Sequence, residues 1–403
     1  VLALALVHSG VPSQTLYRAC SPYTTIINYE LKNGGYTSWK QEERLFGILD
    51  LHELQSKRII VTTCHFASTL YGIGMSSFSH IVIDEAGQLN VMEAMLPLCM
   101  ANEDTNILLS GDFHQLGPRF HSKKAQVFKI DLSPLEELYK GYSTYRGPGS
   151  ENFVTKLIAQ HRCPAQIARF PFENFYGDYE CTGRWRFPSH LRQTPEPFTG
   201  FCLAVGIPKF YPVIFCDFRG VNIQERDSVS LVNPPERLYL VELVTTFATK
   251  MNQTQGLNPN QICVICEQYK QRKRIITQLR HANFGDIYVG SVSALQGKEF
   301  PYVFVATVTV RGPEDFQNGR ARNSFWQSEK KLNTAMTRSS KLVCIIGDSK
   351  TLLQDQHWQK LVTFCKQQQS YTNVDATEYF KKAEYILNGP LVTPIESHPR
   401  RLD

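Results

Sequence analysis

The chain has 403 residues, of which 42% are apolar and 20% are charged, and its net charge is +6. This composition is typical of globular domains and argues against an intrinsically disordered chain. No apolar run approaches the roughly 20 residues that a membrane-spanning helix needs. Residues 1–150 hold 12 basic and 14 acidic side chains, whereas residues 151–403 hold 31 and 23. A basic second half favours a polyanionic partner, although solvated basic faces are common.

Short apolar runs alternate with longer helical patterns along the chain, which predicts parallel α/β layers. The apolar runs are rich in Val and Ile, as expected for strands that are covered on both faces. We expect strands at residues 58–62, 80–83, 106–110, 213–216, 261–266, 286–290, 302–308 and 342–346. We expect helices at residues 41–57, 134–139, 164–175, 236–251, 268–281, 329–338 and 357–368. The first apolar run, residues 1–7, is interpreted as part of a strand.

The chain starts without Met inside this first run and shows no signal-peptide pattern, so we interpret it as a fragment of a longer polypeptide. The polar residues 141–152, rich in Gly and Pro, predict a domain boundary. We therefore expect one domain at residues 1–150, a second at residues 151–370 and a carboxyl-terminal tail at residues 371–403. The eleven cysteines lie mostly in or beside apolar stretches, which favours a reducing compartment.

Two adjacent carboxylates, Asp84 and Glu85, follow directly after the apolar residues 81–83. In open α/β sheets, ligands bind just beyond the carboxyl ends of the strands. An Asp in that place can hold Mg²⁺, and the next Glu can orient and deprotonate a water for phosphoryl transfer. The alternative for this pair alone is a solvated turn between a strand and a loop.

A second strand end carries Gly111 and Asp112, and a loop bounded by Gly and Pro then presents Gln115. An amide in that place can sense a γ-phosphate. Two guanidinium groups, Arg162 and Arg338, can reach phosphate oxygens, Arg338 as an arginine finger supplied in cis. For either arginine alone, a surface salt bridge is the commoner explanation.

Five sequence blocks in this order resemble the superfamily 1 helicases of the Upf-like group, over about residues 58–348. These blocks are Asp84-Glu85-Ala86-Gly87-Gln88 (motif II), Gly111-Asp112 through Gln115 to Pro118 (motif III), Gln160-His161-Arg162, Gln296-Gly297-Lys298-Glu299 (motif V) and Asn333 to Arg338 (motif VI). Within the group, Asn233-Pro234-Pro235-Glu236 and Thr309-Val310-Arg311 resemble the branch of the helicase-with-zinc-finger proteins and the Armitage/Mov-ten RNA-silencing helicases.

The resemblance implies tandem RecA-like P-loop NTPase domains of the α/β class, with parallel sheets flanked by helices and the first domain incomplete. It implies an ATP-dependent motor on single-stranded RNA that uses ATP and Mg²⁺ and works with ribonucleoprotein, silencing or decay proteins. The expected location is the cytoplasm, with the nucleus not excluded. The implied catalytic residues are Asp84 as Mg²⁺ ligand, Glu85 as general base, and Gln115, Arg162 and Arg338 at the γ-phosphate. The implied nucleotide-binding residues are Gln160, Gly297 and Glu299, and the implied RNA contacts are Thr62, Thr63, Ser293 and Arg311.

The sequence departs from the family pattern at several places. It contains no G-x-x-x-x-G-K-[S/T] loop, so we expect the chain alone to hydrolyse ATP poorly or not at all. Gln268 stands where the family has an adenine-stacking Tyr, and the nearest Tyr, Tyr269, follows one position later in the sequence. Ser293 stands where much of the family has Asp. These changes leave two alternatives: a degenerate helicase that acts as a non-catalytic RNA-binding scaffold, and a DNA-directed helicase. The aromatic residues 185–211 could stack bases, although packing is the commoner role.

Overall fold

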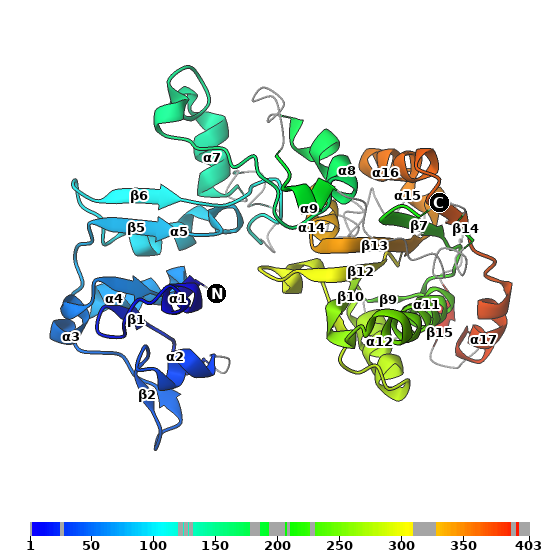
Figure 1. The fold of residues 1–403 in the computed structure, drawn as a ribbon, viewed down its shortest axis with the longest axis horizontal. Helices are drawn as coiled ribbons and strands as arrows, with labels where there is room; N and C mark the ends of the chain where they lie inside the picture. Colours follow the sequence, from blue (N-terminus) through cyan, green and yellow to red (C-terminus); the bar gives the residue numbers. More distant parts are fainter. Residues whose placement is uncertain are drawn as a thin grey trace, which may run out of the picture. The chain divides into compact units, whose positions relative to one another are not determined.

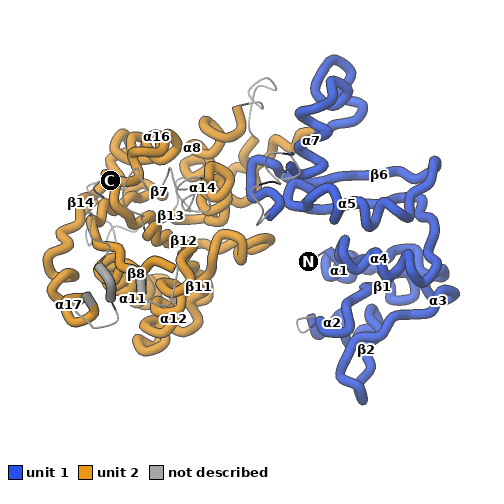
Figure 2. The backbone as a smooth tube through the Cα atoms, turned by 180° about the vertical axis from the view of Figure 1, so that it is seen from behind, with its two compact units in different colours: residues 1–155 blue, residues 156–403 orange. Residues whose placement is uncertain are grey.

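The polar residues 141–152 contain two short 3₁₀ helices, Ser143–Tyr145 and Ser150–Asn152. Just after them the chain divides into two compact units, Val1–Thr155 and Lys156–Asp403 (Figure 2). The sequence places this boundary at residue 150. The computed structural model describes residues 2–24, 28–119, 124, 128, 132–177, 186–192, 206–207, 210–225, 230–308, 328–387 and 392–394.

Unit 1 holds two pairs of parallel strands, β1 with β4 and β5 with β6, and an antiparallel hairpin of β2 and β3. Its strands are β1 (Leu16–Arg18), β2 (Trp39–Lys40), β3 (Leu45–Phe46), β4 (Ile59–Val61), β5 (His80–Ile83) and β6 (Asn106–Leu109). Its helices are α1 (Leu2–His8), α2 (Tyr29–Asn33), α3 (Leu51–Ser56), α4 (Cys64–Gly72), α5 (Val91–Leu98) and α7 (Pro134–Gly141).

Two predictions for unit 1 are wrong. The first apolar run forms helix α1 and not a strand, and Leu and Ala are indeed strong helix formers. The helix predicted over residues 41–57 is shorter and begins only at Leu51, after the β2–β3 hairpin. Its start is a capping box in which the Asp50 side chain accepts from the Glu53 N–H at 2.8 Å and the Glu53 carboxylate accepts from the Asp50 N–H at 3.2 Å.

Unit 2 is built on a six-stranded sheet in the order β11-β10-β12-β13-β7-β14, with every neighbouring pair parallel. Helices α11 and α12 cover one face of this sheet, and α8, α14 and α16 lie on the other (Figure 1). The sheet strands are β7 (Val213–Asp217), β10 (Ile262–Cys266), β11 (Tyr288–Gly290), β12 (Phe300–Ala306), β13 (Ser339–Gly347) and β14 (Tyr371–Asn373). The helices are α8 (Ala165–Phe175), α9 (Ser189–Arg192), α11 (Pro234–Gln255), α12 (Tyr269–His281), α14 (Glu329–Met336), α15 (Ser349–Leu352), α16 (Gln356–Gln367) and α17 (Thr377–Leu387). The parallel α/β architecture expected from the sequence is confirmed.

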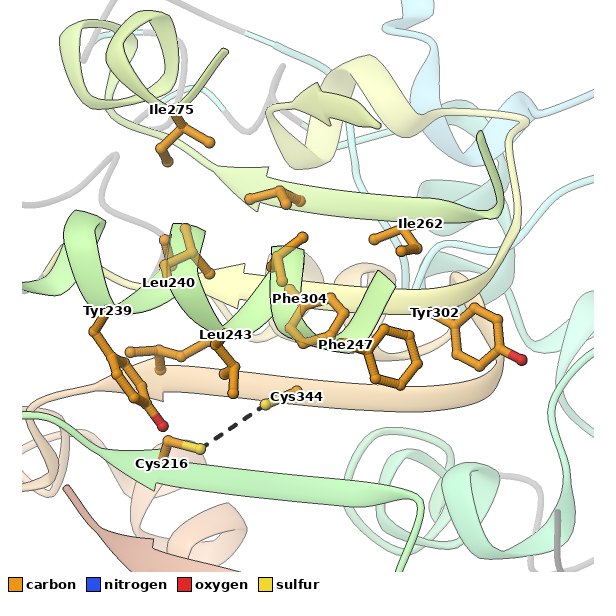
Figure 3. Packing of buried hydrophobic residues seen from close by; sticks show 14 of the residues in the cluster. Cys216, Tyr239, Leu240, Leu243, Phe247, Ile262, Ile275, Tyr302, Phe304 and Cys344 are labelled. Carbon is orange, nitrogen blue, oxygen red and sulfur yellow. Dashed lines mark hydrogen bonds between the residues drawn. The ribbon is translucent and has the colours of Figure 1, made fainter. Parts of the chain in front are cut away.

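The core of unit 2 lies between α11 and the central strands (Figure 3). Phe247 of α11 contacts Tyr302 and Phe304 of β12, with ring centroids 5.0 and 5.4 Å apart. The Cys216 and Cys344 sulfur atoms, on the neighbouring strands β7 and β13, are 3.9 Å apart. Burying one such apolar side chain stabilises the fold by about 1.5–3 kcal/mol. The contacts between α11 and the central strands therefore hold this helix against the sheet.

Helix α11 begins at the sequence Asn233-Pro234-Pro235-Glu236. The Asn233 side chain accepts from the Glu236 N–H at 3.1 Å and so caps the helix. The Glu236 carboxylate turns inward, is fully buried and accepts from the Val308 N–H at 3.1 Å. The start of α11 is therefore tied to the chain that leaves β12.

The segment that begins at residue 371, expected as a separate tail, contributes to unit 2. Strand β14 pairs with β7, and α17 packs against α11 through Tyr379, whose ring lies 5.4 Å from that of Tyr239. Further along, β15 (Val392–Pro394) pairs with β8 (Ile223–Glu225), which pairs with β9 (Leu231–Val232). Within the described ranges, no helix has both the length and the apolar character needed to cross a membrane.

The described cysteines differ in exposure, and this difference predicts their reactivity. Cys163 and Cys365 are fully buried, and burial raises the pKa of each thiol to about 12, whereas Cys99 is exposed. Because the thiolate is the nucleophile, we expect iodoacetamide at neutral pH to alkylate Cys99 well before Cys163 or Cys365. Peptide mass mapping over a time course measures the order. Equal rates for the three cysteines in the folded protein would contradict the packing of unit 2.

Candidate functional site

The first part of the candidate site lies in unit 1, where β5 and β6 end side by side. Asp84 follows β5, and its Oδ1 accepts from the Glu85 N–H at 3.0 Å and from the Ser110 hydroxyl at 2.6 Å. Ser110 follows β6, and its N–H donates to the Ile83 carbonyl at 2.9 Å. The Asp84 carboxylate is therefore fixed in direction through one oxygen atom. Ser110 received no role from the sequence alone; its position directly before Gly111 at a strand end was the available signal.

Glu85 has a left-handed backbone, with φ 56° and ψ 33°. This conformation is uncommon for a residue with a side chain, and such strain costs about 1–3 kcal/mol and clusters at functional sites. The Glu85 Oε2 accepts from the Gln88 amide at 2.6 Å. The backbone turn and this hydrogen bond together set the direction of the carboxylate. Gln88 is a second residue whose role the sequence did not reveal.

Two glycines bring the turns after β5 and β6 into backbone contact. A Cβ atom on Gly87 would lie 2.7 Å from the Asp112 carbonyl oxygen, and one on Gly111 would lie 2.8 Å from the Gly87 nitrogen. Real Cβ atoms essentially never approach other atoms this closely. Glycine is therefore required at both positions by the close approach of one backbone to the other.

Asp112 organises the loop after β6. Its Oδ1 accepts from the His114 N–H and its Oδ2 accepts from the Gln115 amide, each at 2.9 Å. The predicted γ-phosphate sensor Gln115 is thus held beside Asp112. In unit 1 the structure brings together Asp84, Glu85 and Gln115 through two adjoining turns.

The predicted RNA contacts Thr62 and Thr63 follow β4. The exposed Thr63 is the N-cap of α4, and its hydroxyl accepts from the Phe66 N–H at 3.3 Å. The Thr62 hydroxyl oxygen is buried and has no hydrogen-bond partner among the described residues. Thr63 therefore caps α4, and its contact with RNA stays a prediction.

The second part of the candidate site lies in unit 2. The Gln160 Oε1 accepts from the Arg162 N–H at 2.8 Å, which shapes the turn before α8. The Arg162 Nε then donates to Glu299 Oε2 at 2.5 Å, and its Nη1 donates to the Thr337 carbonyl at 3.2 Å. Gly297 has φ 67° in the turn that leads to Glu299, a conformation that favours glycine. Residues far apart in the sequence thus meet at one corner of unit 2.

Arg338 belongs to the same corner but is 5% exposed. Its Nε donates to the Thr334 carbonyl at 3.3 Å, and its Nη1 donates to the Lys298 carbonyl at 3.5 Å. The guanidinium therefore joins α14 to the turn that precedes β12. Of the remaining predicted residues, Ser293 lies on the 3₁₀ helix η6 (Val292–Leu295), and Arg311 lies outside the described residues.

Gln268 stands where the family has an adenine-stacking Tyr, and its side chain is held by two hydrogen bonds. Gln268 Oε1 accepts from the Ser230 hydroxyl at 3.2 Å and the Leu231 N–H at 3.0 Å. Tyr269 is exposed at the start of α12, with Lys273 Nζ 4.8 Å from its ring centroid. In the aromatic-rich segment 185–211, Trp185, Phe198 and Phe201 lie outside the described ranges, whereas the Phe187 and Tyr211 rings pack against other aromatic rings. Among the residues whose placement is described, no group of three or more His, Cys, Asp or Glu side chains is arranged to hold a metal ion.

Comparisons with known proteins place the chain in a family. A family model described as "AAA domain" matches residues 130–350, and another with the same description matches residues 30–123. "RNA helicase Mov10l1" of Mus musculus is 30% identical over 339 residues, which cover 81% of this chain and 28% of that protein. "Probable helicase with zinc finger domain" of Homo sapiens is 28% identical over 370 residues, which cover 83% of this chain and 18% of that protein. The chain thus spans under a third of the length of these relatives.

One solved structure, the complex of Arterivirus nonstructural protein 10 (helicase) with DNA, aligns with a TM-score of 0.38 and 13% identity, over 87% of this chain and 52% of that chain. The fold and the matched models define an α/β protein with helicase-type AAA domains. The chain belongs to this AAA domain family and, within it, to the Upf-like helicases of superfamily 1. The family resemblance stated from the motifs is confirmed.

Proposed function

We propose that this chain is the core of an ATP-dependent RNA helicase or translocase, which hydrolyses ATP while bound to single-stranded RNA. The observation that carries the proposal is the carboxylate pair Asp84 and Glu85, each held in a fixed direction at the end of β5. Fixed carboxylates are what phosphoryl transfer requires, because positioning and electrostatics supply most of its catalysis.

Asp84 and Ser110 fit a magnesium ion. Mg²⁺ prefers hard oxygen ligands and keeps several waters, and an exposed carboxylate beside a hydroxyl at 2.6 Å offers such a donor set. When bound, the ion neutralises phosphate charge. Glu85 orients the attacking water and accepts its proton, and the hydrogen bond from Gln88 holds this carboxylate in place.

Arg162 and Glu299 are proposed to exchange partners when nucleotide binds. Their ion pair is partly exposed, with side-chain exposures of 32% and 64%, and such pairs stabilise by about 0–1 kcal/mol. A phosphate can therefore replace Glu299 as the partner of Arg162 at little cost. Glu299 is then available to accept from a ribose hydroxyl, and Arg338 is proposed as the second phosphate contact, with Gln160 and Gly297 shaping the same corner.

The RNA track is proposed to involve Thr62, Thr63, Ser293 and Arg311. Hydroxyl and guanidinium groups favour contacts with phosphate and sugar, so we propose binding that depends on salt and only weakly on sequence. The printed names of two relatives, an RNA helicase and a helicase with a zinc finger domain, support nucleic acid as the substrate class.

The test is ATP hydrolysis by the full-length protein with no nucleic acid, with single-stranded RNA and with single-stranded DNA at matched salt. We expect RNA to raise turnover by about ten-fold, a common size for coupling between two sites. Turnover that is slow and unchanged by RNA would support the non-catalytic scaffold. Stimulation by DNA alone would assign the chain to the DNA-directed helicases. The 403-residue chain, which lacks the G-K-[S/T] loop, is the matched control and is expected to be nearly inactive.

A further inference from the structure

The turn after β10 carries Glu267, directly before Gln268. Glu267 Oε1 accepts from the Val292 N–H at 2.7 Å, and its Oε2 accepts from Lys331 Nζ at 3.1 Å. The Glu267 and Lys331 side chains are each 18% exposed. Hydrogen bonds to ionised groups are shorter and stronger than neutral ones, so one carboxylate holds two separate elements.

The two elements held by Glu267 are those that carry proposed functional residues. Val292 opens the 3₁₀ helix η6, and Ser293, a proposed RNA contact, is the next residue. Lys331 lies on α14, and the chain leaving this helix carries Arg338, a proposed phosphate contact. The Arg338 guanidinium in turn donates to the Thr334 carbonyl in α14. A continuous path of described contacts therefore runs from the Ser293 turn through Glu267 to Arg338.

Stability alone is a weak explanation for this ion pair. A partly buried pair loses hydration that its mutual attraction only approximately repays, so such pairs contribute little net stability. The Val292 N–H and Lys331 are 25 and 64 residues away from Glu267 in sequence, so only tertiary structure brings them to it. The arrangement does fix the orientation of η6 relative to α14.

We infer that Glu267 is a positioning residue that couples the turn carrying Ser293 to the helix leading into Arg338. Through it, RNA bound at the turn changes the phosphate contact made by Arg338 and thereby the rate of ATP turnover. This inference rests on the proposed function and specifies how its two sites are connected within unit 2.

Three substitutions separate the two contacts. Glu267→Gln keeps an acceptor for the Val292 N–H but removes the charge that faces Lys331. Lys331→Met removes the same ion pair from the other side, and Glu267→Ala removes both contacts. The matched control is Glu242→Ala, on α11 at the opposite face of the sheet, whose carboxylate pairs with Lys382 at 3.4 Å.

The experiment measures ATP turnover of each full-length variant without RNA and with saturating single-stranded oligouridylate. We expect Glu267→Ala to lower the ratio of stimulated to unstimulated turnover by about five-fold, with unstimulated turnover within about two-fold of wild type. Glu267→Gln and Lys331→Met are each expected to lower this ratio by less than Glu267→Ala does. The double variant is expected to have the same ratio as either single variant, because both substitutions remove the same ion pair. Glu242→Ala is expected to keep the wild-type ratio.

A wild-type ratio in both Glu267→Ala and Glu267→Gln, with only a lower melting temperature, would show that Glu267 is merely structural and would overturn the inference. Equal losses in Glu242→Ala would overturn it as well. A wild-type protein that RNA does not stimulate would instead refute the proposed function, and the inference with it. The wild-type measurement and the ratios of the variants thus report the two failures separately.

Discussion

Glu85→Gln in the full-length protein is expected to lower kcat for ATP hydrolysis by about 10³-fold, in the middle of the range that a general base contributes. The amide keeps the size of the side chain and an acceptor for the Gln88 hydrogen bond of 2.6 Å, so the turn after β5 is expected to stay intact. Only the ability to accept a proton from water is lost. Binding of RNA and of nucleotide is expected to change by less than about three-fold, because neither depends on that proton.

The measurement compares steady-state phosphate release by wild type and Glu85→Gln, with RNA binding followed by fluorescence anisotropy. The matched control is Glu93→Gln, in the capping box of α5 in the same unit, where Gln serves as well as Glu. Equal and slow hydrolysis by wild type and Glu85→Gln would show that the carboxylate pair is not used for catalysis. The scaffold alternative would then be the better description.

Glu236→Gln is expected to change the pH dependence of stability. Burial raises the pKa of the Glu236 carboxyl to about 8, the hydrogen bond from the Val308 N–H opposes this rise, and Asp348 adds to it. The unfolded carboxyl titrates near 4.5, so between these pH values the folded state binds the extra proton. The stability contributed by this group is complete below pH 4.5 and is lost as pH rises through 8. The loss is on the order of 5 kcal/mol.

The amide that Glu236→Gln introduces cannot titrate, so the free energy of unfolding of the variant is expected to fall less between pH 5 and pH 9 than that of wild type. Urea denaturation at several pH values, followed by circular dichroism, measures the difference. Glu242→Gln, an exposed change on the same helix, is the control and is expected to follow the wild-type curve. Parallel curves for Glu236→Gln and wild type would mean that the carboxyl is solvated or ionised in the folded protein.

The central parallel strands of unit 2 were predictable because burial on both faces demands uninterrupted apolar runs, whereas β5 and β6 of unit 1 have apolar runs although one face of each is exposed. Strand β5 matches its prediction, and β10 and β13 differ from theirs only at the ends. The error at α1 arose because the apolar pattern alone does not separate a short buried strand from a helix. The hairpin before α3 was missed because the polar residues 41–44 are compatible with a helix, whereas the Trp39 and Phe46 rings, with centroids 4.8 Å apart, favour paired strands.

The candidate site was predictable where function follows from the position of a residue at a strand end. Asp84, Glu85 and Asp112 were found in this way. The supporting hydrogen bonds could not be derived, because they join residues distant in sequence: Ser110 is 26 residues from Asp84, and Glu299 is 137 from Arg162. Glu267 was not identified from the sequence, because its contacts with Val292 and Lys331 lie 25 and 64 residues away and exist only in the folded chain.

The contact between Gly87 and Gly111 divides mutations in unit 1 into two kinds. Because the turns after β5 and β6 meet through main-chain atoms, a displacement of one is transmitted to the other without any side chain between them. Substitutions at Asp84 or Asp112 remove a carboxylate and the hydrogen bonds that it accepts, including the one from Ser110 to Asp84, but they leave this main-chain contact in place. A methyl group at either glycine acts in the opposite way: it separates the two turns while every reactive group is still present.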